Sequence, residues 1–281
     1  MRWVGGIGLC FLLAMSTTAI AAPERILSAN LCADQLLLEL SPKQHILAVS
    51  DFAHDPSLSY SHVLAQHIPH IRGTAEEILS LRPDLALIGP AQISPAINAI
   101  LQQHHIPTFE VSIPTNIHAI ETQIRTLANV IGREEVGKKL LARMQSRLIQ
   151  VKLRSKQLSF TPRILIYHQG GYTESSDSIL AALLPYVGAE PYTSQTHVSL
   201  EQLTTDPPDL IVYPYVANTT PSIGDIPIHH PIFKDWKPEQ FMPLDAALLM
   251  CNNHQIAEIA HRIMDRLEAL EPPKPFIAST R

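Results

Sequence analysis

The chain has 281 residues, of which 46% are hydrophobic and 17% are charged, a composition typical of a globular protein and not of a disordered one. Its formal net charge is −5, so it lacks the basic field with which nucleic-acid-binding proteins attract phosphates, and we expect no nucleic-acid partner. With 11 glycines against 23 prolines, the chain is stiff and offers few flexible linkers.

The first residues have the pattern of a secretory signal. Arg2 supplies a positive charge, residues 4–15 form an uncharged apolar run, and Ala19 and Ala21 are the small residues that signal peptidase requires. The run is shorter than the ~20 residues needed to cross a bilayer. No later segment is apolar enough to span one. We therefore predict that residues 1–21 are a signal peptide, and that the mature protein lies in the periplasm without being embedded in a membrane.

Short apolar strands alternate with helices in the first half of the mature chain. Thr74, followed three residues later by Glu77, predicts a capping box at the start of one helix. Continuous apolar strands separated by helices predict a parallel sheet with helices on both faces. The predicted strands are 25–28, 45–50, 84–89 and 107–111, and the predicted helices are 32–40, 74–81 and 94–104.

A long helical segment then precedes a second α/β pattern. Residues 116–131 and about 134–158 both have helical periodicity, with Gly132 between them. We predict an α/β fold of two lobes with parallel-sheet, Rossmann-like cores, joined by a single long connector helix. The predicted boundaries are an N-terminal lobe 22–131, a connector 132–160, a C-terminal lobe 161–271 and a tail 272–281. The strands predicted in the second lobe are 163–167 and 209–213, and its helices are 178–187, 200–204 and 255–270.

The two halves share a short pattern of helix, Pro-Asp and apolar strand. It occurs at residues 76–85 (EEILSLRPDL) and again at 200–212, where Leu200-Glu201-Gln202-Leu203 precedes Pro208-Asp209. Together with residues 25–28 (RILS) and 48–51 (AVSD), these segments resemble the helical-backbone class of ABC-importer binding proteins, the cobalamin and ferric-siderophore group. The resemblance covers nearly the whole mature chain. It implies two lobes around a shallow cleft, with limited hinge motion.

The resemblance also implies a docking surface for the importer. Members of the group present one glutamate on each lobe to basic pockets of the permease, and by position in the motif these are Glu76 and Glu201 here. The alternative for Glu76 is a helix N-terminal acid that favours the macrodipole, and for Glu201 an ordinary solvated carboxylate.

Loops at the carboxyl ends of the strands are the candidates for ligand contact, because open α/β sheets bind ligands there. The glycine pair before Tyr172 lets backbone approach a ligand closely, although a plain turn explains it equally well. Asp55-Pro56 is a turn signal that offers a structural role to the polar groups near it, and Asn252 to His254 can cap the last helix. The predicted ligand-binding residues are Cys32, Asp51, His54, Tyr60, Pro90, Gln169, Gly170, Gly171, Tyr172, Tyr215, Asn252 and His254.

Two cysteines remain after removal of the signal, Cys32 and Cys251. An oxidising compartment permits a disulfide between them, which would tether the lobes. Their spacing alone does not decide between one bond and two separate thiols.

Other kinds of site have little support in the sequence. The chain has 14 histidines, but it contains no H-E-x-x-H or C-x-x-C pattern, and we expect no bare metal site. It also lacks the G-x-S-x-G, P-loop and G-x-G-x-x-G motifs, so we expect no enzyme and no cofactor.

The resemblance therefore predicts the substrate-binding component of an ABC importer. Its ligand would be a small metal chelate, a corrinoid or a ferric siderophore, and its partners the permease with its ATPase. We expect it to be a monomer. The alternatives are a protein that binds Zn, Mn, Fe or haem directly, and, further off, a periplasmic enzyme or metallochaperone. Few arginines near the predicted cleft favour a less anionic ligand such as a corrinoid.

Overall fold

The computed structural model describes residues 22–90, 95–216, 231–234 and 236–270. The predicted signal peptide 1–21 and the tail 272–281 lie outside the described residues. Within the described ranges, no helix has both the length and the apolar character needed to cross a membrane.

The first lobe is built on a five-stranded parallel sheet with the order β3-β2-β1-β4-β5. Ile26 of β1 is paired with Ile46 of β2 on one side and with Leu85 of β4 on the other. This is the Rossmann strand order: the chain builds outward from β1 to β3 and then crosses back to place β4 on the other side of β1. The strands are β1 (Ile26–Ser28), β2 (Ile46–Ser50), β3 (His70–Ile71), β4 (Leu85–Ile88) and β5 (Thr108–Glu110).

Helices cover both faces of this sheet, as predicted. α1 (Leu31–Leu40) and α5 (Ile117–Val130) pack on one face, and α3 (Ala75–Leu81) and α4 (Pro95–Gln103) on the other. The short helix α2 comprises His62–Ala65. The Asn30 side chain caps α1 by accepting from the backbone N–H groups of Cys32 and Ala33. The capping box predicted at Thr74 and Glu77 is confirmed at the start of α3.

The second lobe has a four-stranded parallel sheet with the order β7-β6-β8-β9. Its strands are β6 (Arg163–Ile166), β7 (Glu190–Pro191), β8 (Leu210–Tyr215) and β9 (Phe241–Asp245). The sequence predicted β6 and β8 but neither edge strand. Its helices are α7 (Leu184–Val187), α8 (Leu200–Thr205), α10 (Ala246–Leu249) and α11 (Ile256–Glu268).

The helix predicted at 178–187 is wrong over its first half. Residues 181–183 form a 3-10 turn, and only Leu184–Val187 are α-helical. Pro185 has no N–H to donate to the carbonyl of residue 181, so a regular helix cannot continue through it.

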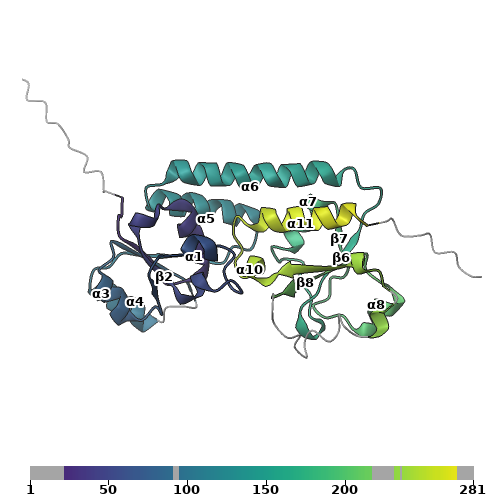
Figure 1. Cartoon of the computed structure of the whole chain (residues 1–281), viewed down its shortest axis with the longest axis horizontal. Coiled ribbons are helices and arrows are strands. Elements are labelled where there is room, and N and C mark those ends of the chain that lie inside the picture. The colour runs from purple at the N-terminus through teal and green to yellow at the C-terminus, as the bar shows by residue number, and fades with distance from the viewer. Residues whose placement is uncertain (1–21, 91–94, 217–230, 235, 271–281) are drawn as a thin grey trace, which may run out of the picture.

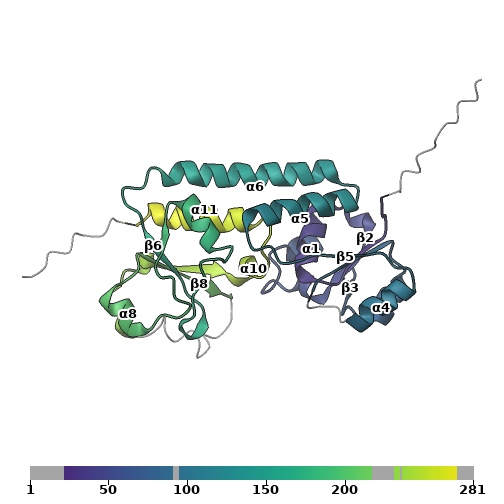
Figure 2. The same cartoon turned by 180° about the vertical axis from the view of Figure 1, so that it is seen from behind.

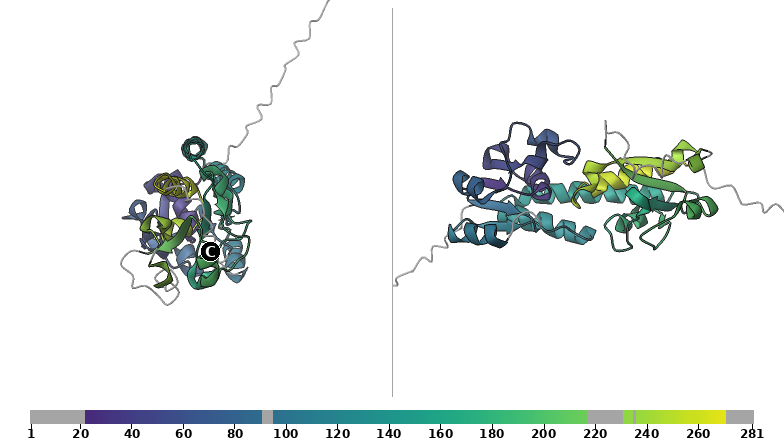
Figure 3. Two further views of the ribbon diagram at one scale, coloured as in Figure 1. Left: turned by 90° about the vertical axis from the view of Figure 1, so that its right-hand side faces the viewer. Right: turned by 90° about the horizontal axis from the view of Figure 1, so that it is seen from below.

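The long helix α6 (Glu134–Ser155) runs along both lobes, which confirms the predicted long helix. Figure 1 shows α6 at one side of the molecule, with α5 beneath its first half and α11 beneath its second, and Figure 2 shows the same arrangement from behind. Seen along the long axis, α6 is viewed end-on at the margin, and from below the two lobes lie one after the other along it (Figure 3). Arg154 near its end is paired with Asp265 and Glu268 of α11.

One hydrophobic cluster extends through both lobes. It includes Leu37 and Ile124 in the first lobe, Leu148 of α6, and Ile166 and Ile263 in the second. The two lobes therefore share a core along α5, α6 and α11. We retain the lobe boundaries 22–131, 132–160 and 161–271 as a proposal.

Candidate functional site

A disulfide between Cys32 and Cys251 joins the carboxyl edges of the two sheets. Cys32 lies in the first turn of α1, directly after β1, and Cys251 follows β9 and α10. Their Cα atoms are 5.4 Å apart. Because all strands within each sheet are parallel, this bond brings the strand ends of one lobe next to those of the other. The two cysteines, which the sequence left as either a disulfide or two separate thiols, are therefore bonded. They are 219 residues apart in the chain.

The segment after Cys251 is anchored in the first lobe by side-chain hydrogen bonds. Asn252 Nδ2 donates to the Pro114 carbonyl at 2.8 Å, and Asn253 Nδ2 donates to Gln35 Oε1 at 3.2 Å. Asn253 Oδ1 also accepts from the backbone N–H of Gln255. The N-cap residue of α11 is Gln255, which makes no side-chain cap hydrogen bond, so the predicted capping of this helix by residues 252–254 is wrong. The amide of Asn252, predicted to contact a ligand, is thus engaged at the junction of the lobes.

His254 and Tyr60 both have partners inside the protein. His254 is buried with its Nε2 3.8 Å from Glu39, and burial lowers the pKa of the imidazole to about 4, so it is neutral at physiological pH. Tyr60 accepts a hydrogen bond from Arg262 of α11 at 3.2 Å. The structure gives both residues partners within the protein, and it does not bring them to the strand ends with the other predicted residues.

The topology places several predicted residues at the two switch points, where the connections that leave two neighbouring parallel strands run toward opposite edges of the sheet. In the first sheet this point lies between β1 and β4. Pro90 lies just after the end of β4 and is exposed. In the second it lies between β6 and β8, which end near Gln169–Tyr172 and at Tyr215. Ligands of open α/β sheets bind at such points.

Exposed apolar side chains also follow strand ends in both lobes. We name five of them the apolar rim. Each is between 44% and 63% exposed, and each lies at or just after the end of a strand or of α10. Exposed apolar residues gathered in one region mark a binding surface, whereas scattered ones do not. The apolar rim consists of Phe52, Ile113, Tyr172, Tyr215 and Met250. Three of these residues (Phe52, Ile113 and Met250) were not predicted.

The glycine loop before Tyr172 is a turn with left-handed backbone. Gly170 and Gly171 have φ values of +78° and +87°, a region that favours glycine. Gly171 is buried, and a Cβ there would lie 2.8 Å from the carbonyl oxygen of Val198. The turn itself therefore requires Gly171. The Tyr172 ring meets His197 edge-on at 5.6 Å and remains exposed.

A polar cluster lies at the carboxyl ends of β2 and β3. Asp51 is 3.6 Å from His70 and 4.0 Å from Arg72, and the ring of His54 meets that of His70 at 5.1 Å. The sequence predicted Asp51 and His54 here but missed His70, the first residue of the two-residue strand β3, and Arg72, which directly follows that strand. In the part of the chain that the structure describes, no group of three or more His, Cys, Asp or Glu side chains is arranged to hold a metal ion.

A cavity of about 240 Å³ lies beside the disulfide. Thr115 of the first lobe and Leu248, Cys251 and Ile259 of the second are among its walls. His168 Nε2 lies 2.7 Å from Glu174 Oε1 at its edge, and this hydrogen bond lowers the pKa of the Glu174 carboxyl. The cavity beside the disulfide therefore has both apolar and polar walls.

The predicted docking glutamates occupy equivalent positions. Glu76 is the second residue of α3 and Glu201 the second residue of α8, both are exposed, and each helix begins with a capping box. Figure 1 shows α3 and α8 on different lobes, both on the side of the molecule away from α6.

These features define a class of protein, two α/β lobes that share a helical spine and present their strand ends to each other. The chain belongs to the Periplasmic binding protein family, which matches residues 26–215. The family description agrees with the expectation of a binding protein and not an enzyme.

The individual proteins that this chain resembles share a low sequence identity with it. A cobalamin-binding protein of Halobacterium salinarum is 26% identical over 70% of this chain, which spans just over half (56%) of that relative's length. A periplasmic heme binding protein of Pseudomonas aeruginosa is 16% identical, with a TM-score of 0.67 over 90% of this chain and 95% of that one. The periplasmic vitamin B12 binding protein of Vibrio cholerae is 19% identical, with a TM-score of 0.61 over 88% of this chain and 98% of that one. At these identities the structural matches establish the fold.

Proposed function

We propose that this protein is the substrate-binding component of an ABC importer and that it carries a metal chelate, a corrinoid in the first instance, between its lobes. The observation that supports this most directly is the apolar rim, because its exposed apolar side chains lie at the strand ends of both lobes, and the disulfide joins those ends. A ligand large enough to touch both lobes would cover these side chains together. This would contribute a favourable free energy of roughly 25 cal/mol for each Å² of apolar surface removed from water.

The charges at the strand ends favour a ligand with little negative charge. Asp51, Glu174 and Asp177 are acidic, whereas Arg72 is basic and already lies beside Asp51. A catecholate or carboxylate siderophore needs cationic partners for charge-assisted hydrogen bonds. A corrinoid presents a flat macrocycle and neutral amide side chains, which suit Tyr172 and Tyr215 better.

Native mass spectrometry and thermal unfolding of the mature chain test this proposal. The probes are cyanocobalamin, a ferric hydroxamate, a ferric catecholate, haem, Zn²⁺ and Mn²⁺. We expect one unchanged cyanocobalamin per chain, and a stabilisation of about 2.7 kcal/mol at a hundredfold excess over Kd. Binding of Zn²⁺ or Mn²⁺ alone would reject the chelate proposal, and chemical conversion of the probe would indicate an enzyme.

Variants of the rim test which surface holds the ligand. Tyr172→Ala and Tyr215→Ala each remove a ring that the ligand would cover, so each is expected to weaken binding by about ten- to a hundredfold. Ile149→Ala is the control, since Ile149 is as exposed as Tyr172 but lies on α6. Equal effects of all three changes would place the ligand elsewhere.

The importer partner is tested through the docking glutamates. Glu76 and Glu201 are exposed and lie in equivalent positions on the two lobes, so Glu76→Ala and Glu201→Ala are expected to leave ligand affinity unchanged. They would lower the rate at which a reconstituted permease and ATPase respond to the loaded protein, because exposed charges chiefly steer and orient a partner. Glu135→Ala, on α6, serves as the matched control. Unchanged stimulation by both lobe variants would contradict the assignment.

A further inference from the structure

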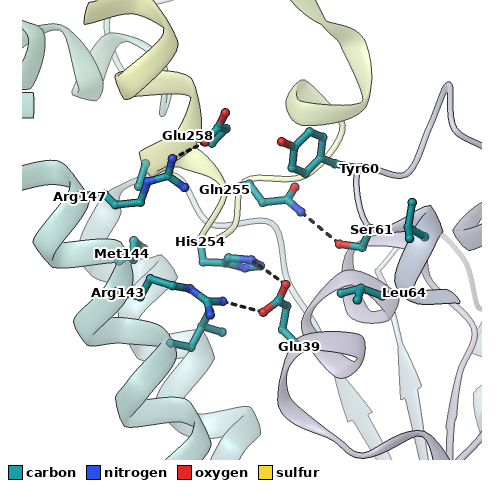
Figure 4. A pocket seen from close by; sticks show the side chains of 13 residues that line it. Glu39, Tyr60, Ser61, Leu64, Arg143, Met144, Arg147, His254, Gln255 and Glu258 are labelled. Carbon is teal, nitrogen blue, oxygen red and sulfur yellow. Dashed lines mark hydrogen bonds and ion pairs between the residues drawn. The ribbon is translucent and has the colours of Figure 1, made fainter.

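A second cavity lies on the flank of the junction, near the end of α1 that is farther from the disulfide. Its volume is about 360 Å³, within the usual range for small-molecule sites. Its walls come from the first lobe, from α6 and from the start of α11 (Figure 4). The charged and polar groups that line it include Glu39, Arg143, Arg147, His254 and Glu258.

Two arginines one turn apart on α6 point into this cavity from the same side (Figure 4). Arg143 donates from Nη2 to Glu39 at 2.7 Å, and Arg147 donates from Nη2 to Glu258 at 2.6 Å. Their side chains are 60% and 41% exposed. Among the described residues, each guanidinium makes this single hydrogen bond, so most of its five N–H donors remain available to a bound molecule.

The local charge favours an anion, although the whole chain carries −5. Arg262, which lies outside the lining, donates to the same Glu258 at 2.8 Å, so three guanidinium groups share two carboxylates around the cavity and leave one positive charge. His254 adds none, because burial keeps its imidazole neutral. Two donors four residues apart on one helix can hold a single carboxylate between them.

The cavity also has apolar walls. Val63 and Leu64 of α2 are 58% and 38% exposed and line the cavity. Leu140 and Met144 of α6 belong to the same lining. An occupant that covers Val63 and Leu64 gains apolar burial in addition to its charge contacts, and it can pack against Leu140 and Met144, which are already buried.

We propose that this cavity binds a small amphiphilic monoanion, a carboxylate with an alkyl or aryl tail. The head group accepts from the free N–H donors of Arg143 and Arg147, and the tail lies between Leu64 and Met144. The site is separate from the strand ends, so its existence does not depend on the function proposed above.

The experiment compares hexanoate, 1-hexanol and hexylamine on the mature chain, by calorimetry and by the NMR signal of the Met144 methyl group. Hexanoate is expected to bind about tenfold or more tightly than hexanol, which corresponds to one charge-assisted hydrogen bond, and hexylamine more weakly still. Hexanoate is expected to shift the Met144 signal. Arg143→Gln and Arg147→Gln are each expected to lower the affinity for hexanoate by about tenfold and to leave the affinity for hexanol unchanged.

Lys138→Gln is the matched control, because Lys138 is an exposed cation on α6 that is paired with Glu135 outside the cavity. Equal affinities for hexanoate and hexanol would overturn the proposal, as would equal losses in Arg147→Gln and Lys138→Gln, or an unchanged Met144 signal. If an arginine variant fails to fold, the comparison of the three probes on the unaltered protein decides the question. Cyanocobalamin binding is measured in parallel, so a failure here is distinguishable from a failure at the strand ends.

Discussion

Reduction of the Cys32–Cys251 disulfide is expected to destabilise the protein strongly. The bond closes a loop of 219 residues. In the chain-entropy treatment, a loop of that length removes about 18 cal/mol/K from the unfolded ensemble, or about 5 kcal/mol at 25 °C. This is a large share of the roughly 5–15 kcal/mol by which folded proteins are stable.

Urea unfolding with and without reductant measures this effect without any mutation. With a slope of about 3 kcal/mol/M, appropriate to a chain of this size, the midpoint is expected to fall by about 1.7 M. The double variant Cys32→Ala, Cys251→Ala should match the reduced protein and should not respond to reductant. A reduced protein whose midpoint lies within about 0.3 M of the oxidised one would refute the reasoning, because the shared core alone would then hold the lobes together.

Three further changes have defined outcomes. Asp34 and His254 are both buried, and burial is the main cause that raises the pKa of Asp34 from 3.8 to about 7 and lowers that of His254 from 6.5 to about 4. Asp34 therefore stabilises the fold at low pH and loses this contribution as pH rises from about 4 to 7, whereas His254 loses its contribution as pH falls from about 6.5 to 4. The two contributions change with pH in opposite directions. In Asp34→Asn only the His254 contribution remains, so the free energy of unfolding should rise with pH; in His254→Gln only the Asp34 contribution remains, so it should fall. Each change should be roughly 3–4 kcal/mol between about pH 4 and 7, measured by urea titrations. Parallel pH profiles for the two variants would contradict this. Gly171→Ala should lower stability more than Gly170→Ala, which costs about 1 kcal/mol, because only at Gly171 would the new Cβ meet a carbonyl oxygen; equal melting temperatures would disagree. Arg154→Gln should cost about 1 kcal/mol, and less at high salt, since two ion pairs to α11 are lost; an effect independent of salt would exclude a charge interaction.

Local signals made most of the fold predictable. Apolar strands such as 84–89, the capping box at Thr74 and the long periodic segment after Gly132 each depend on neighbours within a few residues. The edge strand β9 was missed because Pro243 lies inside it, and a proline argues against a central strand. β9 is at the edge of its sheet, where a missing N–H donor is tolerated.

The candidate site was predictable only in part. The rule that ligands bind at strand ends led to Tyr172 and Tyr215, which the structure places in the apolar rim. Phe52 and Met250 were missed because a single apolar residue in a loop looks the same in sequence whether it is buried or exposed. Tyr60 was assigned to the strand ends, but its partner Arg262 is 202 residues away, a contact that no local pattern reveals.

The shared core along α5, α6 and α11 has a consequence for how this molecule can move. Two bodies that are attached at one flexible point swing apart freely. These two are attached by a continuous helix and by a disulfide at a separate place, and apolar side chains fill the space along the helix. Swinging the lobes apart would stretch one attachment or expose that apolar surface to water. The remaining easy motion is a small twist about the line through the two attachments, so a molecule carried between the lobes must enter and leave through an opening of nearly constant width.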